Sequence, residues 1–201
     1  MHIEILVEER SMEEALKNLL PHMLLPETTY RIISFQGKPN LLRHLPNRLR
    51  GYACWITDEY RILVLLDEDR QNCLALKQQL EAAAQQTGLS TKTSAGGARF
   101  QVLNRIVIEE LEAWFLGDID AIRRAYPRIP ATLANAPKFR NPDSVAGGTW
   151  ETLENTMQRF GYFKGGYAKV EAARAISIHM DPIRNRSRSF QVFRDGLIAM
   201  T

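Results

Sequence analysis

The stretch from Arg61 to Asp69 constrains the fold most. It reads Arg-Ile-Leu-Val-Leu-Leu-Asp-Glu-Asp, an unbroken apolar run that ends on two carboxylates separated by one residue. The run is too short for a buried helix, and its lack of alternation indicates a strand covered on both faces, as in a parallel sheet between helices. Ligands of such sheets gather beyond the carboxyl ends of the strands. Asp67 and Asp69 are therefore candidate functional residues, although an aspartate at this position is also common as a helix cap.

Strand-like and helix-like segments alternate through the first half of the chain. Short β-prone runs occupy residues 3–7, 30–35, 90–94 and 100–108. A capping box of the form Ser11-Met12-Glu13-Glu14 predicts a helix that ends before Pro26, and a second strong helix is predicted over residues 72–86. Between them a shorter helical piece is interrupted at Pro46. This order predicts an α/β fold with a mainly parallel sheet flanked by helices.

The last third of the chain is predicted to be mostly helical. Helices are expected over residues 109–116, 150–160, 168–178 and 190–199, with a long irregular connection from Pro127 to Gly148. Asp118 is a candidate cap for a further short helix, and Ser187 or Ser189 for the final one. We therefore divide the chain into a core, residues 1–122, and a helical carboxyl-terminal extension, residues 123–201, packed on it as one structural unit.

Charge is unevenly distributed between these two segments. Residues 1–122 carry 13 basic and 17 acidic side chains, and residues 123–201 carry 13 and 6, so net charges of −4 and +7 give the overall +3. A basic flank beside an acidic centre suits a polyanionic substrate, whereas an ordinary solvated surface is the alternative. The candidate nucleic-acid contacts in the extension are Lys164, Arg184, Arg186 and Arg188.

Composition favours a protein of a reducing cytoplasm. Cys54 and Cys73 form no CxxC motif, and no histidine lies at zinc-ligand spacing. The amino terminus lacks the pattern of a secretory signal, and no stretch is long enough to cross a bilayer. The sequence leaves open whether the chain forms a homo-oligomer.

Three groups of acids follow apolar strands: Glu8 with Glu9, Asp67 with Asp69, and Glu109 with Glu110 and Glu112, of which Glu109 and Glu112 lie one helical turn apart. Carboxylates gathered at one sheet edge repel one another, so a divalent cation is their natural partner. An all-oxygen site indicates Mg²⁺ or Mn²⁺, as one ion or two. The alternative for the acids near Glu112 is a solvated helix start, which the helix dipole favours anyway. Lys169 is a candidate for neutralising phosphate charge, although it can also be a plain surface lysine.

Two of these motifs resemble the Toprim fold family of primases, topoisomerases and nucleases of the overcoming-lysogenization-defect type. That family has a glutamate ending its first strand and an Asp-x-Asp ending its third, and Leu6-Val7-Glu8 and Leu65-Leu66-Asp67-Glu68-Asp69 match in order and context. Many Toprim domains have glycine where this chain has Glu9. The chain lacks the additional domains with which primases and topoisomerases hold template or broken ends.

A resemblance that covers most of the chain is to the bacterial family called domain of unknown function 4276. The matching stretches are Leu6 to Ser11, Asp67 to Asp69 with Cys73 and Lys77, Glu110 to Trp114, and Tyr167 to Lys169. This resemblance implies Toprim-like, metal-dependent cleavage of DNA or RNA, with Glu8, Asp67, Asp69 and Lys169 as catalytic residues. It also implies a role in antiphage defence beside an ATPase of the ABC or AAA type. Two alternatives are a non-catalytic subunit that binds metal or docks on the ATPase, and nucleotide-sugar transfer, for which no sugar-nucleotide domain is evident.

Overall fold

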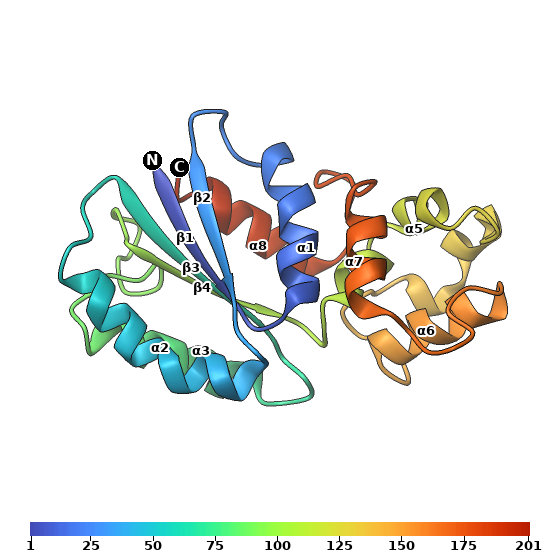
Figure 1. Cartoon of the computed structure of the whole chain (residues 1–201), viewed down its shortest axis with the longest axis horizontal. Helices are drawn as coiled ribbons and strands as arrows, with labels where there is room; N and C mark the ends of the chain where they lie inside the picture. Colours follow the sequence, from blue (N-terminus) through green and yellow to red (C-terminus); the bar gives the residue numbers. More distant parts are fainter.

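The computed structural model describes residues 1–201 and contains one four-stranded, entirely parallel sheet (Figure 1). Its strands are β1 (His2–Val7), β2 (Thr29–Ser34), β3 (Tyr60–Asp67) and β4 (Val102–Val107), in the spatial order β2-β1-β3-β4. All three neighbouring pairs are parallel. The predicted α/β fold with a parallel sheet is therefore confirmed.

Helices cover both faces of the sheet (Figure 1). Helices α2 (Lys38–Ala53) and α3 (Cys73–Gln85) lie on one face, and α1 (Arg10–Leu19) and α8 (Arg188–Ile198) lie on the other. The buried side chains of β3 alternate between the two hydrophobic clusters that these layers form: Leu63 and Leu65 on the α1 side, and Ile62, Val64 and Leu66 on the α2 side. Burial on both faces explains why the strand sequence shows no alternation of apolar and polar residues.

The remaining helices lie on both sides of the boundary at residue 122 between core and extension. They are α4 (Glu112–Leu116), α5 (Ile119–Ala125), α6 (Thr149–Arg159) and α7 (Lys169–Ser177), and they lie beyond the carboxyl end of the sheet, with α7 packed beside α1 (Figure 1). Single 3₁₀ turns occur at Leu20–His22, Ala131–Asn135 and Pro137–Phe139, the last two within the predicted irregular connection. No helix of the chain is long and apolar enough to span a bilayer.

Both segments share one hydrophobic cluster. It comprises 34 buried residues and joins side chains of β1 and β3 to side chains of α4, α6, α7 and α8, among them Ile3, Leu65, Trp114, Leu153, Ile176 and Phe193. After α7 the extension returns to the sheet, where its last helix, α8, packs on β4. The extension is therefore held to the core by apolar packing on both sides of residue 122.

The predicted strand over residues 90–94 is wrong. Thr91 makes only an isolated bridge with Val102. Its hydroxyl accepts a hydrogen bond from the Ser94 backbone N–H at 3.0 Å, and its carbonyl accepts one from the Ala95 N–H at 2.9 Å. This local hydrogen bonding produces a turn in place of a strand, which is characteristic of serine and threonine side chains near backbone groups.

Helix boundaries differ from prediction at three places. The capping box is wrong, because α1 already begins at Arg10, and Ser11 is a buried first-turn residue whose hydroxyl donates to Glu9 Oε2 at 3.3 Å. The predicted interruption at Pro46 is also wrong, since α2 continues through it with Leu45 and Leu49 buried against the sheet. The predicted helix over residues 109–116 begins only at Glu112. By contrast, the predicted caps Asp118 and Ser187 are confirmed.

Candidate metal centre

Three predicted site residues meet at the carboxyl edge of the sheet. Glu8 follows β1, Asp67 ends β3, and Asp69 lies two residues further along. Because β1 and β3 are neighbouring parallel strands, their carboxyl ends lie side by side. One carboxylate oxygen from each of these residues lies within 4.8 Å of the others. The acids are therefore close enough to share one cation.

Glu8 and Asp67 are buried, with exposed fractions of 3% and 9%. Glu8 Oε2 accepts a long hydrogen bond of 3.4 Å from the Asp67 backbone N–H, whereas Asp67 Oδ1 is buried and has no hydrogen-bond partner. A buried carboxylate oxygen without a donor is costly to the folded state. A divalent cation that prefers oxygen ligands would satisfy it, so this donor set fits Mg²⁺ or Mn²⁺.

The pKa values of these acids reflect their crowding. The pKa of Glu8 is raised to about 7, chiefly by burial and then by the charge of Asp69, whereas the charge of Lys38 lowers it. Burial also raises the pKa of Asp67 well above its usual range, with additional contributions from Glu8 and Glu112. Simultaneous ionisation of the cluster is therefore unfavourable unless positive charge is brought to it.

Lys38 is a part of this site that sequence reasoning missed. Its Nζ lies 2.9 Å from Asp69 Oδ2 and donates to the Glu68 carbonyl at 3.0 Å, and the side chain is only 5% exposed. It is the first residue of α2 and follows Gly37, whose φ of 90° favours glycine. The sequence Gly-Lys-Pro after a strand could have indicated that a helix starts at Lys38, because proline is favoured in a first helical turn. That turn lies at the same sheet edge as the acids.

The loops after β3 and β4 hold a constrained backbone. Asp69, Arg70 and Glu109 adopt φ values of 50°, 59° and 61°, a left-handed region that is uncommon for residues other than glycine. The two loops are tied together, since the Asp69 N–H donates to the Glu109 carbonyl at 3.0 Å and the Glu109 N–H donates to Glu68 Oε2 at 3.1 Å. Such conformations persist only where the surroundings enforce them, and they are frequent at functional sites.

Glu112 and Glu109 do not lie as predicted. Glu109 lies before α4 in a left-handed conformation, so the prediction that it shares a helix face with Glu112 is wrong. Glu112 itself is buried and close enough for its charge to raise the pKa of Asp67. Burial raises the pKa of Glu112 to about 7, although the charge of Lys169 opposes this. Glu112 is thus a second buried acid beside the cluster.

Lys169 also reaches the acids, from the first position of α7. Burial alone would lower its pKa, but the carboxylates of Glu112, Glu9 and Glu110 raise it above the usual lysine value. Its Nζ lies 5.6 Å from the centre of the Trp150 ring. The extension therefore contributes an ammonium group to the edge where the core presents its acids.

The other two acids near the site are held by local contacts. Glu9 is half-buried at the start of α1, and its charge adds to the raised pKa values of Glu8 and Asp67. Glu110, which belongs to the third acid group but was not predicted as a metal ligand, accepts at Oε2 from the Trp150 backbone N–H at 3.3 Å. It connects the loop before α4 to the first turn of α6.

The four basic residues predicted to contact nucleic acid are exposed, but the helix end beside the arginines is filled. The Ser187 hydroxyl and the Ser189 backbone N–H both donate to the carboxylate of Asp143, at 2.6 and 2.9 Å. An internal acid thus takes the place at the start of α8 where an anion such as a phosphate would otherwise fit. Arg184 pairs with Asp181 at 2.7 Å. A nucleic-acid contact by Arg184, Arg186, Arg188 and Lys164 stays a prediction.

Fold and site together define an α/β protein with a cluster of buried acids at the carboxyl edge of a parallel sheet. A family model described as "Domain of unknown function (DUF4276)" matches residues 7–198, so the chain belongs to this family. The matched range includes every residue of the candidate metal centre. No curated protein and no solved structure matches the chain.

Proposed function

We propose that this protein is a divalent-metal-dependent nucleic-acid phosphodiesterase. The observation that carries the proposal is the convergence of Glu8, Asp67 and Asp69 around a buried, unpartnered carboxylate oxygen. These residues would hold Mg²⁺ or Mn²⁺. When bound, the ion would polarise a phosphate oxygen and lower the pKa of a coordinated water.

The remaining side chains have roles that follow from their positions. Lys38 holds Asp69 through the 2.9 Å ion pair and so orients its carboxylate toward Glu8 and Asp67. Lys169 offers positive charge to a phosphate that approaches the acids from the side of the extension. Glu112 and Glu9 add negative charge near the cluster, which favours a cation and would attract a second one.

Several observations support a nucleic-acid substrate within this proposal. A glutamate after β1 and an Asp-x-Asp at the end of the adjacent β3 reproduce the arrangement of the Toprim resemblance. Residues 123–201 carry the basic excess, and α6 and α7 of this segment lie beyond the edge where the acids meet (Figure 1). The action of the protein in antiphage defence with an ABC or AAA-type ATPase rests on the resemblance alone.

A second candidate is a non-catalytic subunit of such a module. The ion pair between Lys38 and Asp69 favours it, because an internal ammonium group already supplies part of the positive charge that the cluster requires. In that case the acids would be structural, or would bind metal without cleavage. The two candidates differ in whether phosphodiester bonds are broken.

The deciding experiment is incubation of the purified protein with supercoiled DNA, linear DNA and RNA, with Mg²⁺, Mn²⁺ or chelator. We expect cleavage of at least one polymer with a divalent ion and none with chelator. Metal binding by calorimetry without cleavage of any polymer, also when an ATPase of the ABC or AAA type that the resemblance implies is added, would support the non-catalytic candidate. If the protein neither binds metal nor cleaves any polymer, both candidate functions that depend on a metal ion are excluded.

The raised pKa values predict an unusual pH dependence of stability in chelator. Glu8 and Glu112, each with a pKa of about 7 in the folded state, hold protons that they lose on unfolding. Stability should therefore be highest near pH 5 and fall as the pH rises through about 7. Thermal melts from pH 5 to 8 measure this, and saturating Mn²⁺ should remove the decline because ions bind the deprotonated acids. Melting temperatures that rise over this range in chelator would contradict the protonated cluster.

A further inference from the structure

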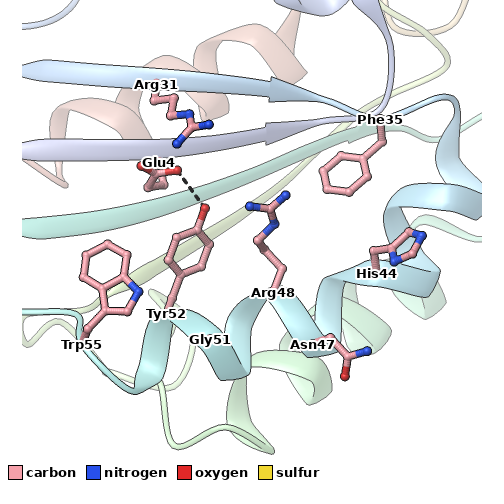
Figure 2. A pocket seen from close by; sticks show the side chains of 9 residues that line it. All are labelled: Glu4, Arg31, Phe35, His44, Asn47, Arg48, Gly51, Tyr52 and Trp55. Atoms are coloured by element: carbon pink, nitrogen blue, oxygen red, sulfur yellow. Dashed lines mark hydrogen bonds between the residues drawn. The ribbon is translucent and has the colours of Figure 1, made fainter.

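A cavity of about 700 Å³ lies between β2, β1 and α2, on the face of the sheet that α2 covers (Figure 2). None of its lining residues belongs to the candidate metal centre. Two cations, two ring systems and one acid define its character: Arg31, Arg48, Phe35, Trp55 and Glu4. The volume lies within the range of sites for small organic ligands.

The two arginines face the same space. Arg31 extends from β2 and Arg48 from α2, and Figure 2 shows their guanidinium groups pointing toward one another across the cavity. Neither forms an ion pair in the structure. The repulsion between these two like charges is only partly offset by Glu4, the one acid of the cavity, and a bound anion would remove it. Guanidinium groups also match the geometry of phosphate oxygens.

The one acid of the cavity is already engaged. Glu4 is buried, and its carboxylate accepts a hydrogen bond from the Tyr52 hydroxyl at 2.8 Å and lies 3.2 Å from His2 Nε2. Figure 2 shows the Glu4–Tyr52 contact beside the arginines. One engaged carboxylate against two guanidinium groups leaves the cavity with net positive charge.

An aromatic platform lies at one end of the cavity. Trp55 is 49% exposed, and its ring is held by edge contacts with Tyr52 and Tyr60, with ring centroids 5.6 and 5.1 Å apart. A ring that is fixed by its neighbours and open to solvent can stack on a planar ligand at little entropic cost. At the other end, Phe35 already has the Arg48 guanidinium 6.0 Å from its ring centre.

We propose that this cavity binds a nucleoside phosphate, with the phosphate between Arg31 and Arg48 and the base on Trp55. The ligand is either a free mononucleotide or the 5′-phosphorylated end of a nucleic-acid strand, because both present the same groups. The inference does not rest on the proposed cleavage activity. The cavity and the metal centre are connected through α2, which carries Lys38 at its first turn and Arg48 and Tyr52 further along.

The test is a titration of the full chain in chelator, followed by calorimetry and tryptophan fluorescence. The probes are the common ribonucleoside 5′-monophosphates, the matching nucleosides, inorganic phosphate, and a trinucleotide with or without a 5′-phosphate. We expect at least one monophosphate to bind, with its nucleoside and inorganic phosphate each at least about tenfold weaker. Tighter binding of the 5′-phosphorylated trinucleotide than of the monophosphate identifies a strand end, and equal or weaker binding identifies a free nucleotide.

Variants locate the binding. Arg48→Ala should weaken the monophosphate about ten- to a hundredfold, and Trp55→Ala at least about fivefold. Arg43→Ala is the matched control, since Arg43 is an exposed arginine of the same helix that bonds to Asn40 and does not line the cavity. Asp67→Asn should bind normally, and circular dichroism confirms folding of each variant. The proposal would be overturned if no monophosphate binds, or if nucleoside and monophosphate bind with equal affinity. It would also be overturned if binding is lost in Asp67→Asn and kept in Arg48→Ala.

Discussion

Asp67→Asn is expected to abolish metal-dependent cleavage and at the same time to stabilise the metal-free protein. The substitution keeps the shape of the side chain but removes one charge from a cluster whose members raise one another's pKa values. Metal affinity should fall about a hundredfold or more, because a ligand is lost directly and supporting residues alone are worth ten- to a hundredfold. In chelator at pH 8 the melting temperature should rise, since repulsion of Glu8 and Asp69 is relieved.

The opposite signs of these two effects make the prediction specific. A variant that merely misfolds would lose metal binding and stability together. Manganese calorimetry, plasmid cleavage and thermal melts in chelator measure the three quantities. Asp58→Asn is the matched control, because Asp58 is an exposed aspartate before the amino end of β3 and should change none of them. Wild-type metal affinity in Asp67→Asn would refute the metal centre, and retained cleavage with weakened metal binding would refute its catalytic use.

The central strand and its acids could be predicted because the relevant signals are local. An unbroken apolar run indicates burial on both faces, and that burial is what the two hydrophobic clusters show for β3. The convergence of Glu8 with Asp67 needed one more step, the parallel order of the strands, which the alternation of strands and helices supplied. The strand order β2-β1-β3-β4 then places their carboxyl ends side by side.

Other parts of the site depend on contacts between distant residues. Lys38 meets Asp69 only because the turn at Gly37 directs the start of α2 back over the sheet edge. Glu112 is buried because the loop after β4 turns at Glu109 and delays the helix, and a left-handed glutamate has no sequence signature. The missing strand at residues 90–94 has a local cause, the hydrogen bonds between Thr91 and Ser94, which strand propensity does not count.

Trp114→Ala is expected to cause the largest loss of stability, about 3–5 kcal/mol. The ring of Trp114 is fully buried, its centre lies 5.0 and 4.8 Å from those of Phe190 and Phe193, and its Nε1 donates to the Ser189 hydroxyl at 3.1 Å. Truncation therefore leaves a large cavity between α4 and α8, in the cluster that also contains β1 and β3. Urea unfolding followed by circular dichroism measures the loss. Trp55→Ala is the matched control, with about 1 kcal/mol expected for a half-exposed ring.

The same experiment tests whether core and extension form one structural unit. Trp55 lies in the first segment and Trp150 in the second, so proteins that retain only one of them report on each segment separately, with the other tryptophans replaced by phenylalanine. Because the hydrophobic cluster spans residue 122, both reporters should unfold at the same urea concentration, whether position 114 carries phenylalanine or alanine. Separate midpoints would show that the extension unfolds independently. Coincident midpoints would mean that Lys169 stays beside the acids for as long as the sheet is folded.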